Sequence, residues 1–205
     1  MARFIGFVFL IFCALVLINY ALTSAGHLFP GGGLAYANQS SDELPSVDFS
    51  LFAKNGAGRS YVTQGYGHTS FSAAYPNGWH DGIDIAAAYG APIYAPGTGT
   101  VLATGNQDDY CYHRGFGKYV AIKDTANNLV LWFGHLGTIA VSPGDAVKKG
   151  MLIGTVGATG FETGTHLHFS VFDADGFTMS PRNGCGPDPT GQDLDPFHYL
   201  GTTYQ

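Results

Sequence analysis

The feature that most limits the folds open to this chain is the repeated interruption of short apolar runs by glycine and turn residues. The chain has 30 glycines, and from about Phe49 onward its apolar runs are short and rich in β-branched and aromatic residues. No segment has an amphipathic helical period. This pattern is typical of compact antiparallel sheets. The sequence therefore predicts an all-β domain, with strands over Pro92–Ala95, Gly99–Thr104, Lys118–Lys123, Leu129–His135, Leu152–Val156 and His166–Phe172.

A long apolar segment opens the chain. Arg3 precedes an apolar run from Phe4 to Leu22, and about 20 such residues can span a bilayer as a helix. The basic residue before the run places the N-terminus inside and the rest of the chain outside. Ala35-Tyr36-Ala37 has the form of a signal cleavage site but lies well beyond the run. Residues 1–25 are expected to form one hydrophobic helix, either a membrane anchor or a cleaved signal peptide, and both options export the domain.

The rest of the chain is expected to hold a linker and one domain. Residues 26–48 are rich in glycine and polar residues, which favours a flexible tether. Residues 49–205 then form a single globular domain, expected to act as a monomer. The net charge is -6, and the sequence has no basic run beyond Lys148-Lys149. Nucleic acid is therefore excluded as an expected partner, because binding it depends on clustered basic residues.

Two cysteines lie in the part of the chain expected to be exported. Cys111 and Cys185 both lie in glycine-rich polar segments. An oxidising compartment would let them pair, so we expect a disulfide between them, with two unrelated thiols as the alternative. Three long segments are expected to wall a groove: Thr69–Trp79, Asn106–Gly117 and Asp173–Pro196. A Cys111–Cys185 disulfide would tie the second segment to the third and stiffen the walls.

Four histidines and one aspartate carry the chemistry. They are His80, Asp84, His135, His166 and His168, in three short segments. Two neutral imidazoles and one carboxylate are a ligand set that Zn²⁺ accepts, and three protein ligands leave a fourth position open for water. The two remaining histidines can then transfer protons. A catalytic zinc site explains this set better than a structural one.

Local spacing agrees with a shared site. His166 and His168 are two residues apart on an expected strand, so their side chains share one face. Gly82 allows a tight bend between His80 and Asp84, with Asp81 as a competing carboxylate. Of the other histidines, only His113 lies in a loop expected to reach the groove. His27, His68 and His198 are assigned no role.

From about Tyr61 to Leu200 the chain resembles the M23 family of zinc metallopeptidases, the lysostaphin- or LytM-type peptidoglycan endopeptidases. The motifs occur in order over nearly the whole exported domain and are specific as a set. The resemblance rests on Thr63-Gln64-Gly65-Tyr66-Gly67, His80-Asp81-Gly82-Ile83-Asp84-Ile85-Ala86-Ala87, Pro92-Ile93-Tyr94-Ala95-Pro96, Gly134-His135-Leu136, Gly144-Asp145-Ala146-Val147-Lys148-Lys149-Gly150, Gly157-Ala158-Thr159-Gly160, Gly164-Thr165-His166-Leu167-His168-Phe169 and Asp195-Pro196-Phe197-His198-Tyr199-Leu200.

The resemblance implies a role for each of the five residues. His80, Asp84 and His168 match the zinc ligands, and His135 and His166 match the two catalytic histidines outside the metal's ligand set. The family fold implies antiparallel sheets with the zinc in a groove walled by loops. Three positions depart from the usual pattern or are uncertain: Phe133 stands where tyrosine is frequent, Ser170 stands where glutamate is common, and Tyr75 is a candidate for the tyrosine that stabilises the oxyanion.

The expected function is zinc-dependent hydrolysis of peptide crosslinks or stem peptides of bacterial cell-wall peptidoglycan. A silent regulatory module that activates other wall hydrolases is the main alternative, and loss of ligands would distinguish it. A carrier domain of biotinyl type is a weaker alternative, because such a domain would not need His80 or Asp84. The sequence leaves open which bond is cleaved, how His135 and His166 divide their roles, and whether the N-terminal segment inhibits the enzyme.

Overall fold

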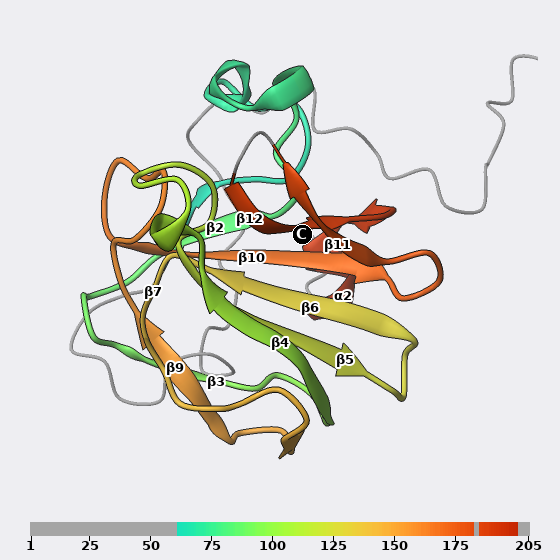
Figure 1. Ribbon diagram of the computed structural model, residues 1–205. Coiled ribbons are helices and arrows are strands. Elements are labelled where there is room, and N and C mark those ends of the chain that lie inside the picture. Colours follow the sequence, from blue (N-terminus) through green and yellow to red (C-terminus); the bar gives the residue numbers. More distant parts are fainter. Residues whose placement is uncertain (1–60, 183–184, 201–205) are drawn as a thin grey trace, which may run out of the picture. The chain divides into compact units, whose positions relative to one another are not determined.

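The computed structural model describes residues 61–182 and 185–200 (Figure 1). Every strand pair in this part of the chain is antiparallel, which confirms the all-β expectation. Its helices are short: η2 (Ser72–Ala74), η3 (Pro76–Gly78), η4 (Gln107–Asp109) and α2 (Pro196–Leu200). Within the same residues, none of these helices has the length and apolar character needed to cross a membrane.

One large sheet organises the domain. Seven of its strands follow the order β1-β2-β10-β6-β5-β4-β8, and β13 pairs with β10 off this path. In Figure 1, β10 crosses the centre of the view with β6, β5 and β4 beside it. The strands are β1 (Tyr61–Gln64), β2 (Ile83–Ala86), β4 (Gly99–Asn106), β5 (Lys118–Asp124), β6 (Leu129–Gly134), β8 (Ala146–Val147), β10 (His166–Asp173) and β13 (Asp193–Leu194).

Two smaller sheets complete the domain. The strands β3 (Pro92–Tyr94), β9 (Leu152–Val156) and β7 (Leu136–Ile139) form a three-stranded sheet in that order. The strands β11 (Thr178–Arg182) and β12 (Cys185–Thr190) form a two-stranded hairpin.

The two faces of the large sheet carry different side chains, because successive residues of a strand point to opposite faces. On β10, Leu167, Phe169 and Val171 pack into the main hydrophobic core. Phe172 points to the other face, into a second cluster with Trp132 of β6. The side chains of β10 that alternate with the core residues therefore lie on the face of the second cluster.

The strands expected from the sequence are all present, with ends shifted by up to two residues. The other strands were not predicted. They are β1, β2, the short strands β7, β8 and β13, and the β11–β12 hairpin, which lies in the long segment Asp173–Pro196 that was expected to wall the groove. The hydrophobic helix of residues 1–25, the linker of residues 26–48 and the domain boundary at residue 49 lie outside the described residues.

Candidate active site

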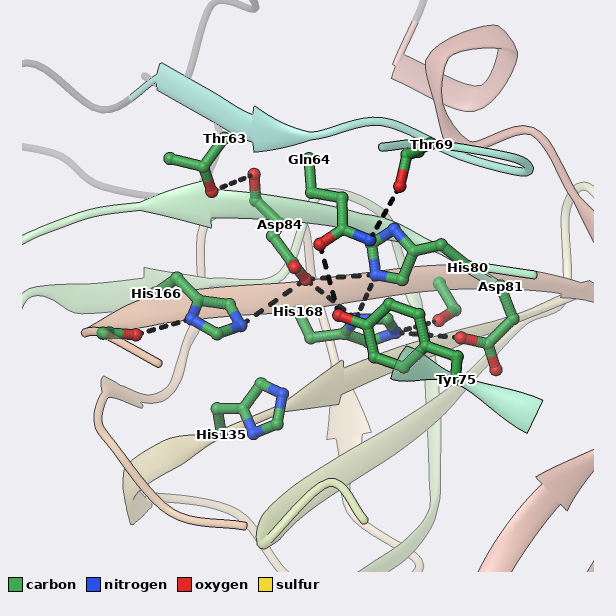
Figure 2. Close-up of polar contacts among 12 residues, drawn as sticks. Thr63, Gln64, Thr69, Tyr75, His80, Asp81, Asp84, His135, His166 and His168 are labelled. Atoms are coloured by element: carbon green, nitrogen blue, oxygen red, sulfur yellow. Dashed lines mark hydrogen bonds and ion pairs between the residues drawn. The ribbon is translucent and has the colours of Figure 1, made fainter. Parts of the chain in front are cut away.

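Two neighbouring strands bring the first two candidate ligands together. Asp84 of β2 and His168 of β10 are direct cross-strand partners. His80 joins them from the segment before β2, where its backbone pairs with Gly67 through two hydrogen bonds of 2.8 and 3.0 Å. Figure 2 shows the three side chains converging, and all three are buried.

The spacing of the converging atoms fits a tetrahedral metal. Asp84 Oδ1 lies 3.3 Å from His80 Nε2 and 3.0 Å from His168 Nδ1. The two ring nitrogens are 3.2 Å apart. Zinc–ligand bonds of about 2.0–2.1 Å at tetrahedral angles put neighbouring ligand atoms about 3.3–3.4 Å apart. The donor set His80, Asp84 and His168 therefore fits zinc in both chemistry and spacing.

Each of the four histidines is held by an oxygen on the side away from this cluster. The Nδ1 atoms of three of them lie 2.6–2.7 Å from backbone carbonyl oxygens: His80 from Gly65, His135 from Thr159 and His166 from Gly164. His168 instead has its Nε2 atom 2.6 Å from Ser170 Oγ. A ring nitrogen that donates outward leaves the other nitrogen with its lone pair facing inward. The surrounding oxygens therefore orient all four rings for binding a metal or accepting a proton.

His135 and His166 lie next to the three candidate ligands. Their ring centroids are 4.6 Å apart, and His166 Nε2 is 3.5 Å from Asp84 Oδ1. Figure 2 shows the two rings side by side next to the cluster. The sequence predicted His135 as the end of a strand, but β6 ends at Gly134 and His135 has φ 58°. A non-glycine residue in this conformation is uncommon, and such residues cluster in turns and at active sites.

The buried charges of the site are strongly coupled. Burial would raise the pKa of the Asp84 carboxyl, but hydrogen bonds from His168 and His80 hold it well below its usual range. Burial would lower the pKa of His168, yet hydrogen bonds to Asp81 and Asp84 raise it to about 9. Burial, with the nearby rings of His166 and His168, lowers the pKa of His135 to about 3. The two aspartates therefore favour the protonated form of the His168 imidazole.

The structure separates the two competing carboxylates. Asp84 Oδ1 lies within the cluster, whereas Asp81 Oδ1 is 3.4 Å from the outward Nε2 atom of His168. Gly82 between them packs against β10: a Cβ built there would lie 2.6 Å from Ser170 Oγ and 2.8 Å from His168 Nε2. This glycine is therefore required by a close approach, and not by the tight bend that the sequence suggested.

Tyr75 lies over the cluster. Its ring stacks on His80 with centroids 5.1 Å apart, and its hydroxyl donates to Gln64 Oε1 over 3.2 Å. Burial, the negative charge of Asp84 and that of Asp81 raise the pKa of the Tyr75 phenol. The hydroxyl therefore stays protonated and can donate a hydrogen bond at the mouth of the site.

The cluster opens into a groove of about 830 Å³. All three segments expected as walls contribute, through residues such as Trp79, Phe116 and Thr190. Trp79 and Phe161 both line it. His68, which was assigned no role, also lines the groove, whereas His113 is not among the lining residues and lies against Gly160 O instead.

Two links fasten the groove walls to each other. The expected disulfide between Cys111 and Cys185 is present, and it joins the η4 loop to the β11–β12 hairpin. The fully buried Gln107 adds to this link, since its Nε2 donates to Pro187 O over 2.8 Å and to Asp188 Oδ1 over 3.0 Å. Sequence reasoning missed Gln107, because a single glutamine in a polar loop carries no pattern.

Comparison with known proteins agrees with this geometry. The family model described as peptidase family M23 matches residues 78–181 of the 205. The chain belongs to peptidase family M23. The match includes all five residues of the cluster, and the family expected from the sequence motifs is confirmed.

Individual relatives match about half or more of this chain. An alignment of 103 residues with peptidoglycan DD-endopeptidase ShyC of Vibrio cholerae has 38% identity and covers 50% of this chain and 22% of that protein. An alignment of 126 residues with glycyl-glycine endopeptidase ALE-1 of Staphylococcus capitis has 30% identity. It covers 62% of this chain and 32% of that protein. The chain thus spans about a fifth to a third of the length of these curated relatives.

Solved structures share the fold. The catalytic domain of the prophage-encoded M23 protein EnpA from Enterococcus faecalis, solved as a point mutant, superimposes with a TM-score of 0.52 at 30% identity. That match covers 71% of this chain and 95% of the other. The catalytic domain of lysostaphin from Staphylococcus simulans gives a TM-score of 0.52 at 28% identity, covering 69% and 92%. These values support the same architecture over nearly the whole of each catalytic domain.

Proposed function

We propose that this protein is a zinc metalloendopeptidase that hydrolyses peptide bonds in bacterial peptidoglycan. His80, Asp84 and His168 are the proposed zinc ligands, and His135 and His166 are the proposed proton-transfer residues. The observation that carries the proposal is the convergence of one carboxylate oxygen and two imidazole nitrogens at 3.0–3.3 Å from one another, at the base of an open groove. The relatives named as peptidoglycan and glycyl-glycine endopeptidases support the substrate class.

Each residue has a task that follows from its contacts. Zinc in such a site supplies Lewis acidity, which polarises a peptide carbonyl and makes water easier to deprotonate. His135 and His166 each donate through Nδ1 to a backbone carbonyl, so each directs Nε2 inward. A nitrogen so placed accepts a proton from the attacking water and returns one to the departing amine. The Tyr75 hydroxyl has one proton, which it donates to Gln64 Oε1 in this structure. Turned away from Gln64, the same proton would donate to the oxygen that gains negative charge.

The disulfide supports the proposed compartment. A disulfide such as Cys111–Cys185 persists in oxidising surroundings, which agrees with a domain that acts outside the cytoplasm. We also propose that residues 1–25 direct the chain to the membrane. They act there either as a retained anchor or as a signal peptide that is cleaved after export. The peptide strands of the cell wall are the proposed partners, and no second subunit is invoked.

A silent regulatory module is the competing function. It would keep the fold but lack part of the ligand set or of the proton-transfer pair. All five residues are present and oriented toward one point, and this favours an active enzyme.

The test measures amines released from purified peptidoglycan by the full chain in mild detergent, with zinc content determined on the same samples. Activity should disappear with chelator and return with zinc. H168A should lose both bound zinc and activity, whereas H198A, which removes an exposed histidine of α2, should keep both. A zinc-loaded chain that releases no amines would favour the regulatory function. Full activity of zinc-free H168A would refute the ligand assignment.

A further inference from the structure

The groove contains one cation whose partner is missing from the described residues. Besides its imidazoles, four of the groove's lining residues carry full charges at neutral pH, namely Asp81, Asp188, Asp193 and Arg114. The carboxylates are engaged: Asp81 lies against His168 at 3.4 Å, and Asp193 accepts from Trp79 Nε1 over 2.6 Å. Asp188 accepts from Gln107.

The Arg114 side chain is exposed, and within residues 61–182 and 185–200 its guanidinium makes no hydrogen bond or ion pair. An exposed arginine is ordinary in itself. What distinguishes this one is the rigidity of the loop that carries it.

Several contacts fix the backbone around Arg114. Its N–H donates to Cys111 O over 3.0 Å, and Cys111 is held by the disulfide to Cys185. The next residue, Gly115, has φ 67°, and its carbonyl accepts from Phe161 N over 2.8 Å. A Cβ at Gly115 would collide with the buried Gln107 amide. A side chain on such a backbone loses less conformational entropy on binding than one on a mobile loop.

The same loop places Arg114 close to the proposed catalytic residues. Phe116, two residues further on, has its ring 4.9 Å from the His168 ring, and its carbonyl accepts from His135 N over 2.8 Å. Two residues of chain span at most about 7 Å. The backbone of Arg114 therefore lies within two residues of groups that contact His135 and His168, and its side chain lines the same groove. A guanidinium on this part of the groove can reach a peptide close to the bond at the site.

A guanidinium in this position matches a carboxylate. Its planar fork binds carboxylates through two parallel charge-assisted hydrogen bonds. The chain has a net charge of -6 and the groove has three acidic side chains, so an anionic peptide needs such a cation to bind well. We propose that Arg114 is a specificity-determining residue, which binds a free carboxylate of the peptide next to the scissile bond.

This inference rests on the proposed function and narrows its substrate. In a direct crosslink through a diamino dicarboxylic acid, the carbon that bears the scissile amide nitrogen also carries a free carboxylate. A glycine bridge has no such group. The enzyme should therefore prefer direct crosslinks of this kind, and amidation of that carboxylate should weaken the preference.

The experiment uses two crosslinked peptide dimers that differ only in a carboxylate or a carboxamide at that carbon. Values of kcat/KM are measured for the full zinc-loaded chain, R114Q, R114K and the control K149Q, which removes an exposed cation outside the groove lining. A charge-assisted pair should favour the carboxylate dimer by about tenfold to a hundredfold. R114Q should bring this ratio close to one, R114K should keep part of it, and K149Q should keep all of it.

Binding of both dimers to the chelated chain, measured by calorimetry, separates the two levels of the proposal. A carboxylate preference in binding without cleavage of either dimer would overturn the proposed function and support the role of Arg114. Equal cleavage of both dimers by the unmodified chain would overturn the role of Arg114 and leave the peptidase standing. An equal fall of kcat/KM for both dimers in R114Q would also overturn that role. So would failure of the chelated chain to bind either dimer.

Discussion

Replacing Gly82 by alanine should damage the metal site without touching any proposed ligand. A Cβ at this position would lie 2.5 Å from Phe169 O, 2.6 Å from Ser170 Oγ and 2.8 Å from His168 Nε2. Below 3.0 Å something must shift, and the nearest of the three atoms, Phe169 O, belongs to the backbone of β10 and cannot turn aside as a side chain could. The methyl group must therefore push β10 and the His168 ring away from β2.

The size of the effect follows from two terms. Overpacking a well-filled interior costs about 1–3 kcal/mol, and at about 2–4 °C per kcal/mol in a domain of this size Tm should fall by roughly 3–10 °C. The displaced ring also loses its alignment with the oxygens that orient it. Perturbing such outer contacts of a ligand lowers metal affinity by about 10- to 100-fold.

The matched control is G65A. Gly65 has no atom within 4 Å of a built Cβ, and its φ lies outside the left-handed region. Its carbonyl still accepts from His80 Nδ1 in the variant, so zinc affinity should be preserved. The assay is zinc titration against a chromophoric chelator, with calorimetric Tm of the metal-free proteins. If G82A bound zinc as tightly as G65A and melted at the same temperature, the close packing of this turn on β10 would be refuted.

Two further predictions concern the groove wall and the proton in the site. The Cys111–Cys185 bond spans 74 residues, so chain entropy predicts a loss of about 4–5 kcal/mol in C111S/C185S. Calorimetry should then find a Tm lower by roughly 8–20 °C, and an unchanged Tm in the double variant would contradict this expectation. The pKa of His168 is raised to about 9, so zinc must displace a proton at pH 7.5. Titration calorimetry in buffers of different ionisation enthalpy should find about one proton released per zinc bound. Zinc affinity should rise up to tenfold per pH unit from about pH 7 to 8.5. Zinc binding without proton release would show that His168 is already neutral.

The sequence predicted the parts of the fold that have a clear pattern. The sequence predicted β10 because Leu167, Phe169 and Val171 alternate with histidine, serine and phenylalanine side chains that point to the opposite face of the sheet. β2 was missed because it has only four residues and is buried almost throughout, so it shows neither alternation nor length. Its position between β1 and β10 is nevertheless what makes Asp84 a cross-strand neighbour of His168.

The β11–β12 hairpin was missed for a different reason. Its register pairs Pro181 with Pro187 and Met179 with Pro189, and proline argues against a strand in the middle of a sheet. A two-stranded ribbon has an outer edge on each strand, where a residue without an N–H costs no ladder hydrogen bond. The sequence pattern therefore indicated a loop, although the chain forms a paired ribbon in the groove wall.

The site also depends on groups that carry no side-chain signature. Three of the four imidazoles are oriented by backbone carbonyls, those of Gly65, Thr159 and Gly164. Any residue type supplies a carbonyl, so these contacts depend on the backbone path and not on residue identity. The presence of all five motif residues is therefore necessary for the proposed chemistry but not sufficient for it. A chain that kept the five residues but filled the space at Gly82 would be expected to keep the fold and lose the metal, and this is the kind of change by which such an enzyme could become a silent regulatory module.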